Sequence, residues 1–213
     1  MSWTRPGKRE GREGYHHGNL RQALIDAALA MIAERGPAGF SLTELAREIG
    51  VSPAAPYRHF RDRGALLTEI AQYGYGVFEA QLSGAWDGGR PEPVGALVRC
   101  GRRYLAFARE QPALYAVMFE SGLAMDGDVG LRVASERAFG VLVTAAEAVC
   151  ASIRDRPRPP AMMVALHVWS MAHGIASLFV SHGNGRGRVL PMAAEDLLEA
   201  GLLVYLGALG GRS

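Results

Sequence analysis

Six residues near the N-terminus have the chemistry that a DNA-binding surface needs, and they flank a glycine turn at residues 50–52. They are Thr43, Ala54, Ala55, Tyr57, His59 and Arg63. The hydroxyl of Tyr57, the imidazole of His59 and the guanidinium of Arg63 suit phosphate oxygens, which fix the register of a protein on DNA. The alanine side chains allow close approach to base edges, and their methyls can contact thymine. Thr43 lies early in the preceding predicted helix, where it can reach the DNA backbone or a base.

Two of these residues have an equally good structural interpretation. Tyr57 can be a packed core aromatic, and His59 can be a solvated surface residue. The residue types alone leave both interpretations open.

No catalytic constellation stands out in the rest of the chain. Its carboxylates are scattered, and we find neither a Ser-His-Asp arrangement nor a metal-ligand spacing. His167 and His173 are six residues apart, whereas helical zinc ligands are four residues apart on one face. We therefore expect no enzyme, no cofactor and no metal site, and interpret both histidines as hydrogen-bonded interior residues.

Aromatic and methionine residues in the second half of the chain are candidates for a small-molecule pocket, which is usually apolar with a few polar anchors. The candidates are Tyr104, Phe107, Tyr115, Met118, Phe119, Phe139, Trp169, Met171 and His173. From these we select Tyr104, Phe107, Tyr115, Phe119, Trp169 and His173 as the predicted ligand-binding set. Trp169 and His173 are four residues apart and share a helix face. The alternative, plain core packing, is the commoner role of such residues.

Four helices are predicted to position the N-terminal residues. Asn19 caps the first, which stops at Gly36. Ser41 and Glu44 have the spacing of a capping box at the start of the second, which ends at Gly50. Ser52 is expected to cap a third helix that runs to about His59, with Pro53 at its first position and Pro56 tolerated at its fourth. Asp62 caps the fourth.

Two short capped helices joined by a tight turn predict a helix-turn-helix, whose second helix enters the DNA major groove. An αα-hairpin with a glycine turn also occurs in proteins that do not bind DNA. The pattern alone does not decide between them.

The remaining chain also has helical periodicity, and no strand-like alternation interrupts it. A Gly- and Pro-rich segment at 84–93 is the first credible linker. The later helices are expected at 94–111, 112–123, 129–154, 161–182 and 193–209. The prediction is an all-α protein of about nine helices.

One segment raises the possibility of a membrane span. Residues 161–180 contain no Asp, Glu, Lys or Arg, and about 20 apolar residues can cross a bilayer. His167, Ser170, His173, Gly174 and Ser177 interrupt the run. We therefore favour a helix buried in a core or a subunit interface.

Composition favours an ordinary globular chain. Its 213 residues are 49% hydrophobic and 21% charged, which excludes disorder as the main state. With only Cys100 and Cys150, a disulfide framework is not available, and a reducing cytoplasmic location fits best. The net charge of +2 is concentrated at the front, where residues 1–63 carry 10 Lys and Arg against 7 Asp and Glu. Residues 1–14 are predicted to be a flexible basic arm.

The run YHHGNLRQALIDAALAMIAERGPAGFSLTELAREIGVSPAAPYRHFRDRGALL, at 15–67, resembles the DNA-binding domain of TetR-type (TetR/AcrR) transcriptional regulators. The most specific part is GVSPAAPYRHF with the following Arg63 and Leu66-Leu67. This resemblance implies an all-helical homodimer. It also implies that the helix-turn-helix of each subunit binds a palindromic operator in double-stranded DNA. It places Ser52, Pro53, Ala54 and Ala55 at the groove-facing tip, Tyr57, His59 and Arg63 on phosphates, and Thr43 at a contact from the preceding helix.

The resemblance also implies a division of the chain. Residues 15–63 form the DNA-binding domain, 64–82 the connecting helix, and 83–213 a helical C-terminal domain for effector binding and dimerisation. Trp169, His173 and Gly174 resemble the pattern of the subgroup with a WHG-type C-terminal domain. Helices 161–182 and 193–209 then pair with their symmetry mates, so the apolar run is buried by dimerisation and not by lipid.

We therefore expect a ligand-responsive repressor that a small molecule releases from its operator. Two alternatives remain: a helical sensor of the same fold that no longer binds a specific operator, and a membrane-anchored helical protein.

Overall fold

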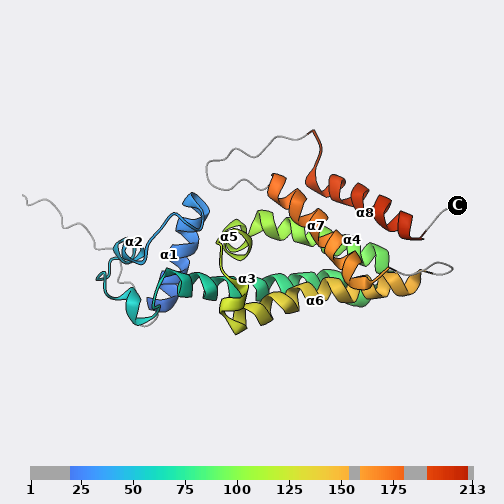
Figure 1. Ribbon diagram of the computed structural model, residues 1–213. Coiled ribbons are helices and arrows are strands. Elements are labelled where there is room, and N and C mark those ends of the chain that lie inside the picture. The colour runs from blue at the N-terminus through green and yellow to red at the C-terminus, as the bar shows by residue number, and fades with distance from the viewer. Residues whose placement is uncertain (1–19, 154–158, 180–190, 211–213) are drawn as a thin grey trace, which may run out of the picture.

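The computed structural model describes residues 20–153, 159–179 and 191–210, all of whose regular elements are helices. Figure 1 shows an elongated molecule with α1 and α2 at one end and the C-terminal helices at the other. The predicted basic arm at 1–14 and the predicted cap Asn19 lie outside the described residues. The α-helices are α1 (Leu20–Arg35), α2 (Leu42–Glu48), α3 (Arg63–Trp86), α4 (Pro93–Glu110), α5 (Pro112–Glu120), α6 (Val129–Ser152), α7 (Ala161–Phe179) and α8 (Ala194–Gly210). Three short 3-10 helices join them: η1 (Pro56–Arg58), η2 (Asp87–Gly89) and η3 (Met125–Gly127).

The caps of the N-terminal helices are those that the residue types predict. The Ser41 side chain accepts a hydrogen bond from the backbone N–H of Glu44 at 3.2 Å, and Glu44 accepts one from the backbone N–H of Ser41 at 2.8 Å. This is the predicted capping box. Gly36 and Gly50 follow α1 and α2 with φ of +76° and +75°, a conformation that costs a glycine little. Asp62 caps α3 through the backbone N–H of Ala65, at 2.8 Å.

The third predicted helix is not an α-helix, which accounts for the difference from the expected number of about nine helices. Among the described residues there are eight α-helices, and the segment after α2 forms only turns and the 3-10 helix η1. Pro56 has no N–H, so no bond returns from it to the carbonyl of Ser52, and Ala55 instead donates to that carbonyl at 2.9 Å. Ser52 therefore caps no helix, and η1 begins without a side-chain cap.

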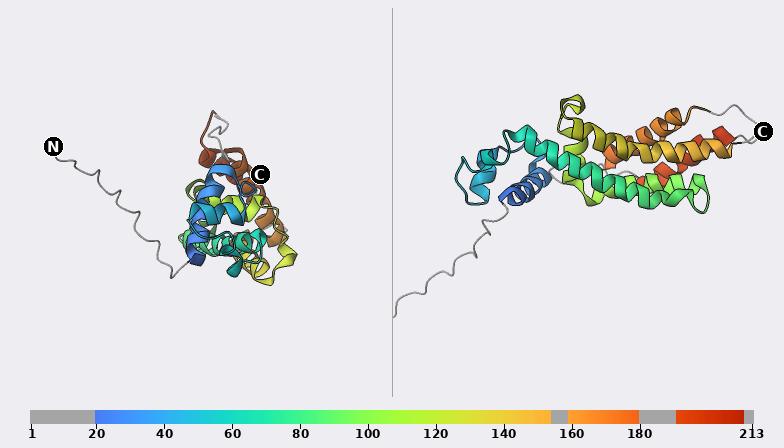
Figure 2. Two further views of the ribbon diagram at one scale, coloured as in Figure 1. Left: turned by 90° about the vertical axis from the view of Figure 1, so that its left-hand side faces the viewer. Right: turned by 90° about the horizontal axis from the view of Figure 1, so that it is seen from below.

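Helix α3 is longer than its sequence suggests and joins the two halves. It runs through Gly84 to Trp86, so the expected linker at 84–93 is reduced to η2 and a few extended residues. The chain turns there because Asp87, Gly88 and Gly89 all have left-handed φ values, of 46°, 62° and 79°. Figure 2 shows α6 running beside α3 along most of the C-terminal half.

One continuous apolar core extends through both halves. Leu66, Leu67 and Ile70 of α3 are buried against the N-terminal helices, and Phe78, Leu82 and Trp86 are buried further along the same helix. The other helices of the C-terminal half surround α3 and one another: α4, α5 and α6 contact α3, whereas α7 lies against α4, α6 and α8. Helix α5 also reaches the N-terminal half, because it contacts α1 as well as α3.

Two glycines of α3 allow a matched test of this packing. A Cβ on Gly74 would lie 2.8 Å from Sδ and 3.1 Å from Cγ of Met118 in α5, whereas a Cβ on Gly76 would meet no atom within 4 Å. We expect Gly74→Val to lower the free energy of unfolding by about 1–3 kcal/mol through overpacking. Gly76→Val makes the same change on the exposed side of α3. We expect it to change the free energy of unfolding by less than about 0.5 kcal/mol. Urea unfolding followed by circular dichroism measures both, and equal losses would contradict the close α3–α5 packing.

Candidate nucleic-acid interface and aromatic cavity

The predicted DNA-contacting residues lie at the tip formed by α2, η1 and the start of α3. Ser52, Pro53, Ala54, Tyr57 and His59 are exposed, and Thr43, Ala55 and Arg63 are partly buried. The Tyr57 side chain is not part of the core, because the residue is 54% exposed. Of its two interpretations, the structure therefore supports the surface position.

Buried neighbours hold this tip in place. Pro56 and Phe60 are buried on either side of the exposed residues Tyr57 to His59. The backbone N–H of Phe60 donates to the carbonyl of Pro56 at 3.0 Å, which closes the turn. The tip is thus a short rigid segment with its polar side chains directed away from the core.

Arg63 occupies an unusual environment for an arginine. Its guanidinium lies over the ring of Phe40, 5.1 Å from the ring centroid, in cation–π geometry. Its Nε is buried and has no hydrogen-bond partner among the described residues. The side chain is therefore oriented by an apolar ring and is not paired with a carboxylate by any ion pair in the described part of the chain.

The sequence reasoning missed two exposed arginines at the same tip, Arg58 and Arg61. Arg61 is 86% exposed in its side chain and pairs with Asp62 at 3.0 Å. A count of basic residues within 52–63 would have found both. Their positive charge adds to the attraction of this end for a polyanion.

The C-terminal half contains an aromatic cavity of about 280 Å³. It lies between α3, α5, η3, α6 and α7 and is lined by Tyr75, Phe78, Phe119, Met125, Ser135, Glu136, Ala138, Phe139, Leu142, Leu166 and Trp169. Most of these side chains are aromatic or aliphatic, and the rings of Phe139 and Trp169 meet edge to face with centroids 6.0 Å apart. Such a cavity suits an apolar molecule or an apolar part of one.

A histidine at the centre of the aromatic cluster ties its rings together. Nδ1 of His173 lies 2.9 Å from the hydroxyl of Tyr104 and 3.0 Å from that of Tyr115. The rings of Phe119 and Trp169 contact the same imidazole, with centroids 5.1 and 5.6 Å away. Both hydroxyls lie within hydrogen-bond distance of this one nitrogen, and the tautomer of the imidazole sets which group donates.

Burial keeps these groups uncharged. It lowers the pKa of His173, and it raises the pKa of Tyr104 and Tyr115. Burial also raises the pKa of Tyr75 to about 12, and the Tyr75 hydroxyl donates to the carbonyl of Met118 at 3.2 Å. At neutral pH the histidine and the tyrosines of this cluster are therefore uncharged, and they are joined by hydrogen bonds between neutral groups.

The structure brings five of the six predicted ligand-binding residues into this one cluster. Phe119 and Trp169 line the cavity, and Tyr104, Tyr115 and His173 lie directly behind them. Phe107 is fully buried beside Phe78, with centroids 4.9 Å apart, and does not line the cavity.

The cavity residues that sequence reasoning missed come from several helices, among them Tyr75 and Phe78 of α3 and Ala138 and Leu142 of α6. The two α3 residues lie in a helix that the sequence analysis expects only to connect the domains. The continuation of its apolar spacing past Ile70 was a signal that this helix also serves the second half of the chain.

Neither a metal site nor a lipid-facing segment is needed to explain the described residues. They contain no group of three or more His, Cys, Asp or Glu that could hold a metal ion. Helix α7 is the one described helix long and apolar enough to cross a membrane. It packs against α4, α6 and α8 of its own chain, and those helices cover part of its apolar surface.

The cavity makes a prediction about apolar ligands. Leu166 lines it and is 43% exposed, so a larger side chain there can enter the cavity without disturbing the core. We expect Leu166→Trp to weaken binding of an anilinonaphthalene sulfonate dye by roughly 10-fold. That factor corresponds to a loss of about 1.4 kcal/mol in binding free energy. Met162→Trp, one turn earlier on α7 and outside the cavity lining, is the control. Dye fluorescence measures both, and equal affinities would show that the dye binds elsewhere.

Solved structures share this architecture. A protein of unknown function from Rhodococcus sp. RHA1 is 28% identical, with 94% of this chain and 100% of that one covered and a TM-score of 0.78. The TetR family transcriptional regulator PfmR from Thermus thermophilus is 21% identical, with 86% and 96% covered and a TM-score of 0.66. AibR, solved in complex with isovaleryl coenzyme A and operator DNA, is 22% identical, with 86% and 96% covered and a TM-score of 0.66.

Comparisons of the amino-acid sequence with known proteins and protein families point to the same kind of protein as the solved structures. The HTH-type transcriptional regulator BetI from Rhizobium meliloti (strain 1021) is 32% identical over 101 residues, which are 46% of this chain. The matched region covers 50% of the length of this curated relative. Residues 24–70 match the family described as bacterial regulatory proteins, tetR family, and residues 97–204 match the tetracyclin repressor-like C-terminal domain. Because the second match alone spans half of the sequence, and the first covers the helix-turn-helix, this chain belongs to the TetR family of transcriptional regulators.

Proposed function

We propose that this protein acts as a homodimeric repressor that binds a palindromic operator and leaves it when a small molecule binds. The observation that carries the proposal is the exposed tip of η1, where Tyr57 and His59 stand beside Arg63 at the start of α3. These side chains suit phosphate oxygens, and the small Ala54 before them suits a base edge. A TetR family regulator is not an enzyme, and the neutral aromatic cavity agrees with a binding role.

The proposed dimer uses α7 and α8. Their exposed faces carry large apolar side chains, among them Leu178 on α7 and Leu203 and Val204 on α8, which are 50%, 55% and 75% exposed. Gly174 and Gly207 leave open space on the same two helices. Two copies related by a twofold axis would bury this surface in a four-helix interface, over the described parts of the segments expected at 161–182 and 193–209. The residues of the proposed WHG-type pattern, Trp169, His173 and Gly174, lie on α7.

The proposed effector occupies the aromatic cavity. One solved relative, AibR, was crystallised with both isovaleryl coenzyme A and operator DNA. A short acyl group or a small aromatic ring would fit the apolar lining of the cavity here. The cytoplasm, where operator and metabolites meet, is the proposed location.

A direct route connects this cavity to the DNA-binding half. Helix α5 contributes Phe119 to the cavity wall and Tyr115 to the His173 cluster, and α5 also contacts α1. A molecule that displaces Phe119 therefore acts on α5 and through it on α1. Two conformations that differ in the position of α1 and η1 would differ in operator affinity, and the effector would select the weaker binder.

A sensor of the same fold without a specific operator is the alternative. It would keep the aromatic cavity but would not need exposed phosphate-binding side chains at η1. The exposed Tyr57 and His59 favour the operator-binding protein.

Operator binding is tested with purified protein and the DNA that flanks its own gene, by fluorescence anisotropy at several salt concentrations. We expect Arg63→Gln to weaken binding by roughly 10-fold and to reduce the salt slope by about one per protomer, because a phosphate contact is lost. Arg35→Gln removes the same charge from an exposed site on α1, 52% exposed, and is expected to bind like wild type. Equal affinity of wild type for scrambled DNA would favour the sensor without an operator.

Dimerisation is tested by placing a charge on the proposed interface. We expect Val204→Glu to shift the dimer to monomer at about 10 μM, because two carboxylates would face each other across the twofold axis. Val129→Glu, at a site 69% exposed at the start of α6, is the matched control and is expected to remain dimeric. Light scattering after size-exclusion chromatography gives both masses. A Val204→Glu protein that remained dimeric would place the interface on another surface.

A further inference from the structure

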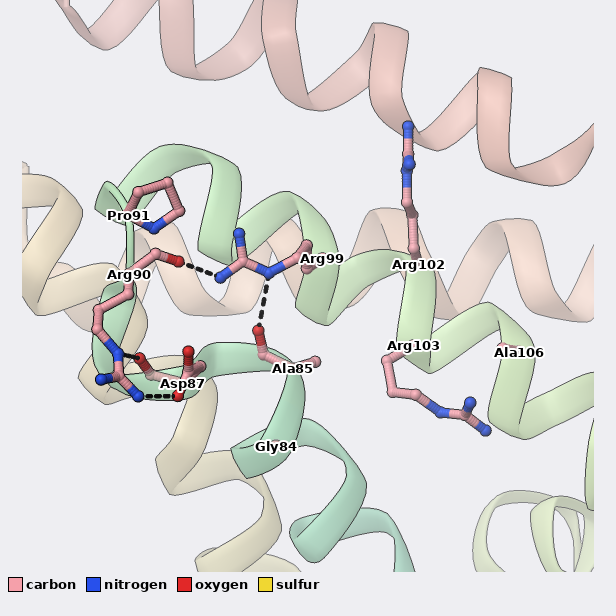
Figure 3. A pocket seen from close by; sticks show the side chains of 9 residues that line it. All are labelled: Gly84, Ala85, Asp87, Arg90, Pro91, Arg99, Arg102, Arg103 and Ala106. Atoms are coloured by element: carbon pink, nitrogen blue, oxygen red, sulfur yellow. Dashed lines mark hydrogen bonds and ion pairs between the residues drawn. The ribbon is translucent and has the colours of Figure 1, made fainter.

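An arginine-lined groove lies where the end of α3, the η2 turn and α4 meet (Figure 3). Its volume is about 860 Å³, and its lining consists of Gly84, Ala85, Asp87, Arg90, Pro91, Arg99, Arg102, Arg103 and Ala106. None of these residues lines the aromatic cavity. The groove is therefore a separate feature of the C-terminal half, and the proposed function makes no use of it.

Arg99 is held in one orientation by main-chain acceptors. Its Nε donates to the carbonyl of Ala85 at 3.2 Å, and its Nη2 donates to the carbonyl of Arg90, as Figure 3 shows. Both acceptors are uncharged, and no ion pair joins Arg99 to a carboxylate within the described residues. Its full positive charge is thus positioned at the groove before any ligand binds.

Small residues keep the groove open beside this charge. Arg99 and Arg103 are four residues apart on α4 and share a face, with Ala106 one turn further on. Across from them, a Cβ built on Gly84 would meet no atom within 4 Å. Figure 3 shows Arg102 and Arg103 extending to opposite sides of α4, so they border the space without filling it.

The lining carries four arginines and one carboxylate, and the arginines other than Arg99 are each paired with a carboxylate. Asp87 is the single carboxylate among the nine lining residues, and it is paired with Arg90. The hydrogen bond from Arg90 and the charges of Arg90 and Arg99 hold the pKa of Asp87 below its usual value. Arg102 and Arg103 pair with Glu199 and Glu110 outside the lining. Since a guanidinium has five N–H donors, these pairs leave further donors for a ligand.

We propose that this groove is a second ligand site, which takes a small molecule carrying two or more phosphate or carboxylate groups. Arg99 binds one anionic group, and Arg90 and Arg103 on either side reach the next. Planar guanidinium groups recognise both kinds of oxyanion in bidentate geometry, which favours an oligoanion over a single monovalent anion. Occupancy ties α4 to the end of α3.

The test is calorimetric titration of the full-length protein with pyrophosphate, ADP and citrate, each at the same ionic strength set with sodium chloride. We expect at least one of them to bind wild type with a Kd below about 1 mM. Ala106→Glu places a carboxylate in the groove, leaves the Arg99 hydrogen bonds intact, and is expected to weaken this binding by at least roughly 10-fold. Ala30→Glu, at an exposed position of α1, is the matched control and is expected to bind like wild type.

A second variant tests the role of Arg99 itself. Arg99→Gln is expected to weaken binding by a similar factor. Because Arg99 also holds the α3–α4 connection, a thermal unfolding curve is recorded for it, and Ala106→Glu decides the question if Arg99→Gln does not fold. Binding of pyrophosphate and ADP but not of citrate identifies a phosphate ligand, and the reverse identifies a polycarboxylate.

Three results would overturn the proposal. The first is that none of the three anions binds wild type at about 1 mM. The second is that Ala106→Glu binds as tightly as wild type. The third is that binding is lost in Arg63→Gln and kept in Ala106→Glu, which would locate the anion on the DNA-binding tip.

Discussion

The burial of α3 is the constraint on which the rest of the structure depends. Leu66 and Leu67 near its start are buried with the N-terminal helices, and Leu82 and Trp86 near its end are buried in the C-terminal half. Because these side chains pack in one continuous core, a bend in α3 would open a cavity there. The two halves are therefore joined by packing as well as by the chain.

The same helix forms one wall of the aromatic cavity. Tyr75 and Phe78 face Phe119 of α5, with ring centroids 5.9 and 6.4 Å apart. The cavity is thus enclosed by the helix that carries the DNA-binding half and by α5, which contacts that half directly. In the proposed mechanism, the effector acts on both connections at once, since its cavity is bounded by both helices.

Polar groups within this apolar environment decide how its rings are arranged. Burying the hydroxyls of Tyr104 and Tyr115 without partners would cost several kcal/mol, roughly 2–7 for each. Nδ1 of His173 lies within hydrogen-bond distance of both hydroxyls, so one imidazole provides a polar partner for two tyrosines. Since the network is neutral and internally satisfied, it supports a cavity that selects ligands by shape and apolar contact more than by charge.

The sequence alone determined the helical architecture and the caps of α2 and α3, because their signals are local. The Ser41–Glu44 capping box and the Asp62 cap each lie within one turn, and both are present as predicted. Pro56 is also a local signal, and the segment that it begins forms the 3-10 helix η1 in place of the expected α-helix.

Tertiary structure decided what depends on partners far apart in the chain. Helix α3 continues past Gly84 to the buried Trp86, whereas the Gly- and Pro-rich composition of residues 84–93 predicts a linker. The aromatic cavity and the arginine groove exist only because packing brings α3 against α4, α5 and α6. A helical period shows that a residue faces inward, but not which helix it will meet. That choice is made by the complementary shapes of whole helix faces, which no short sequence window contains.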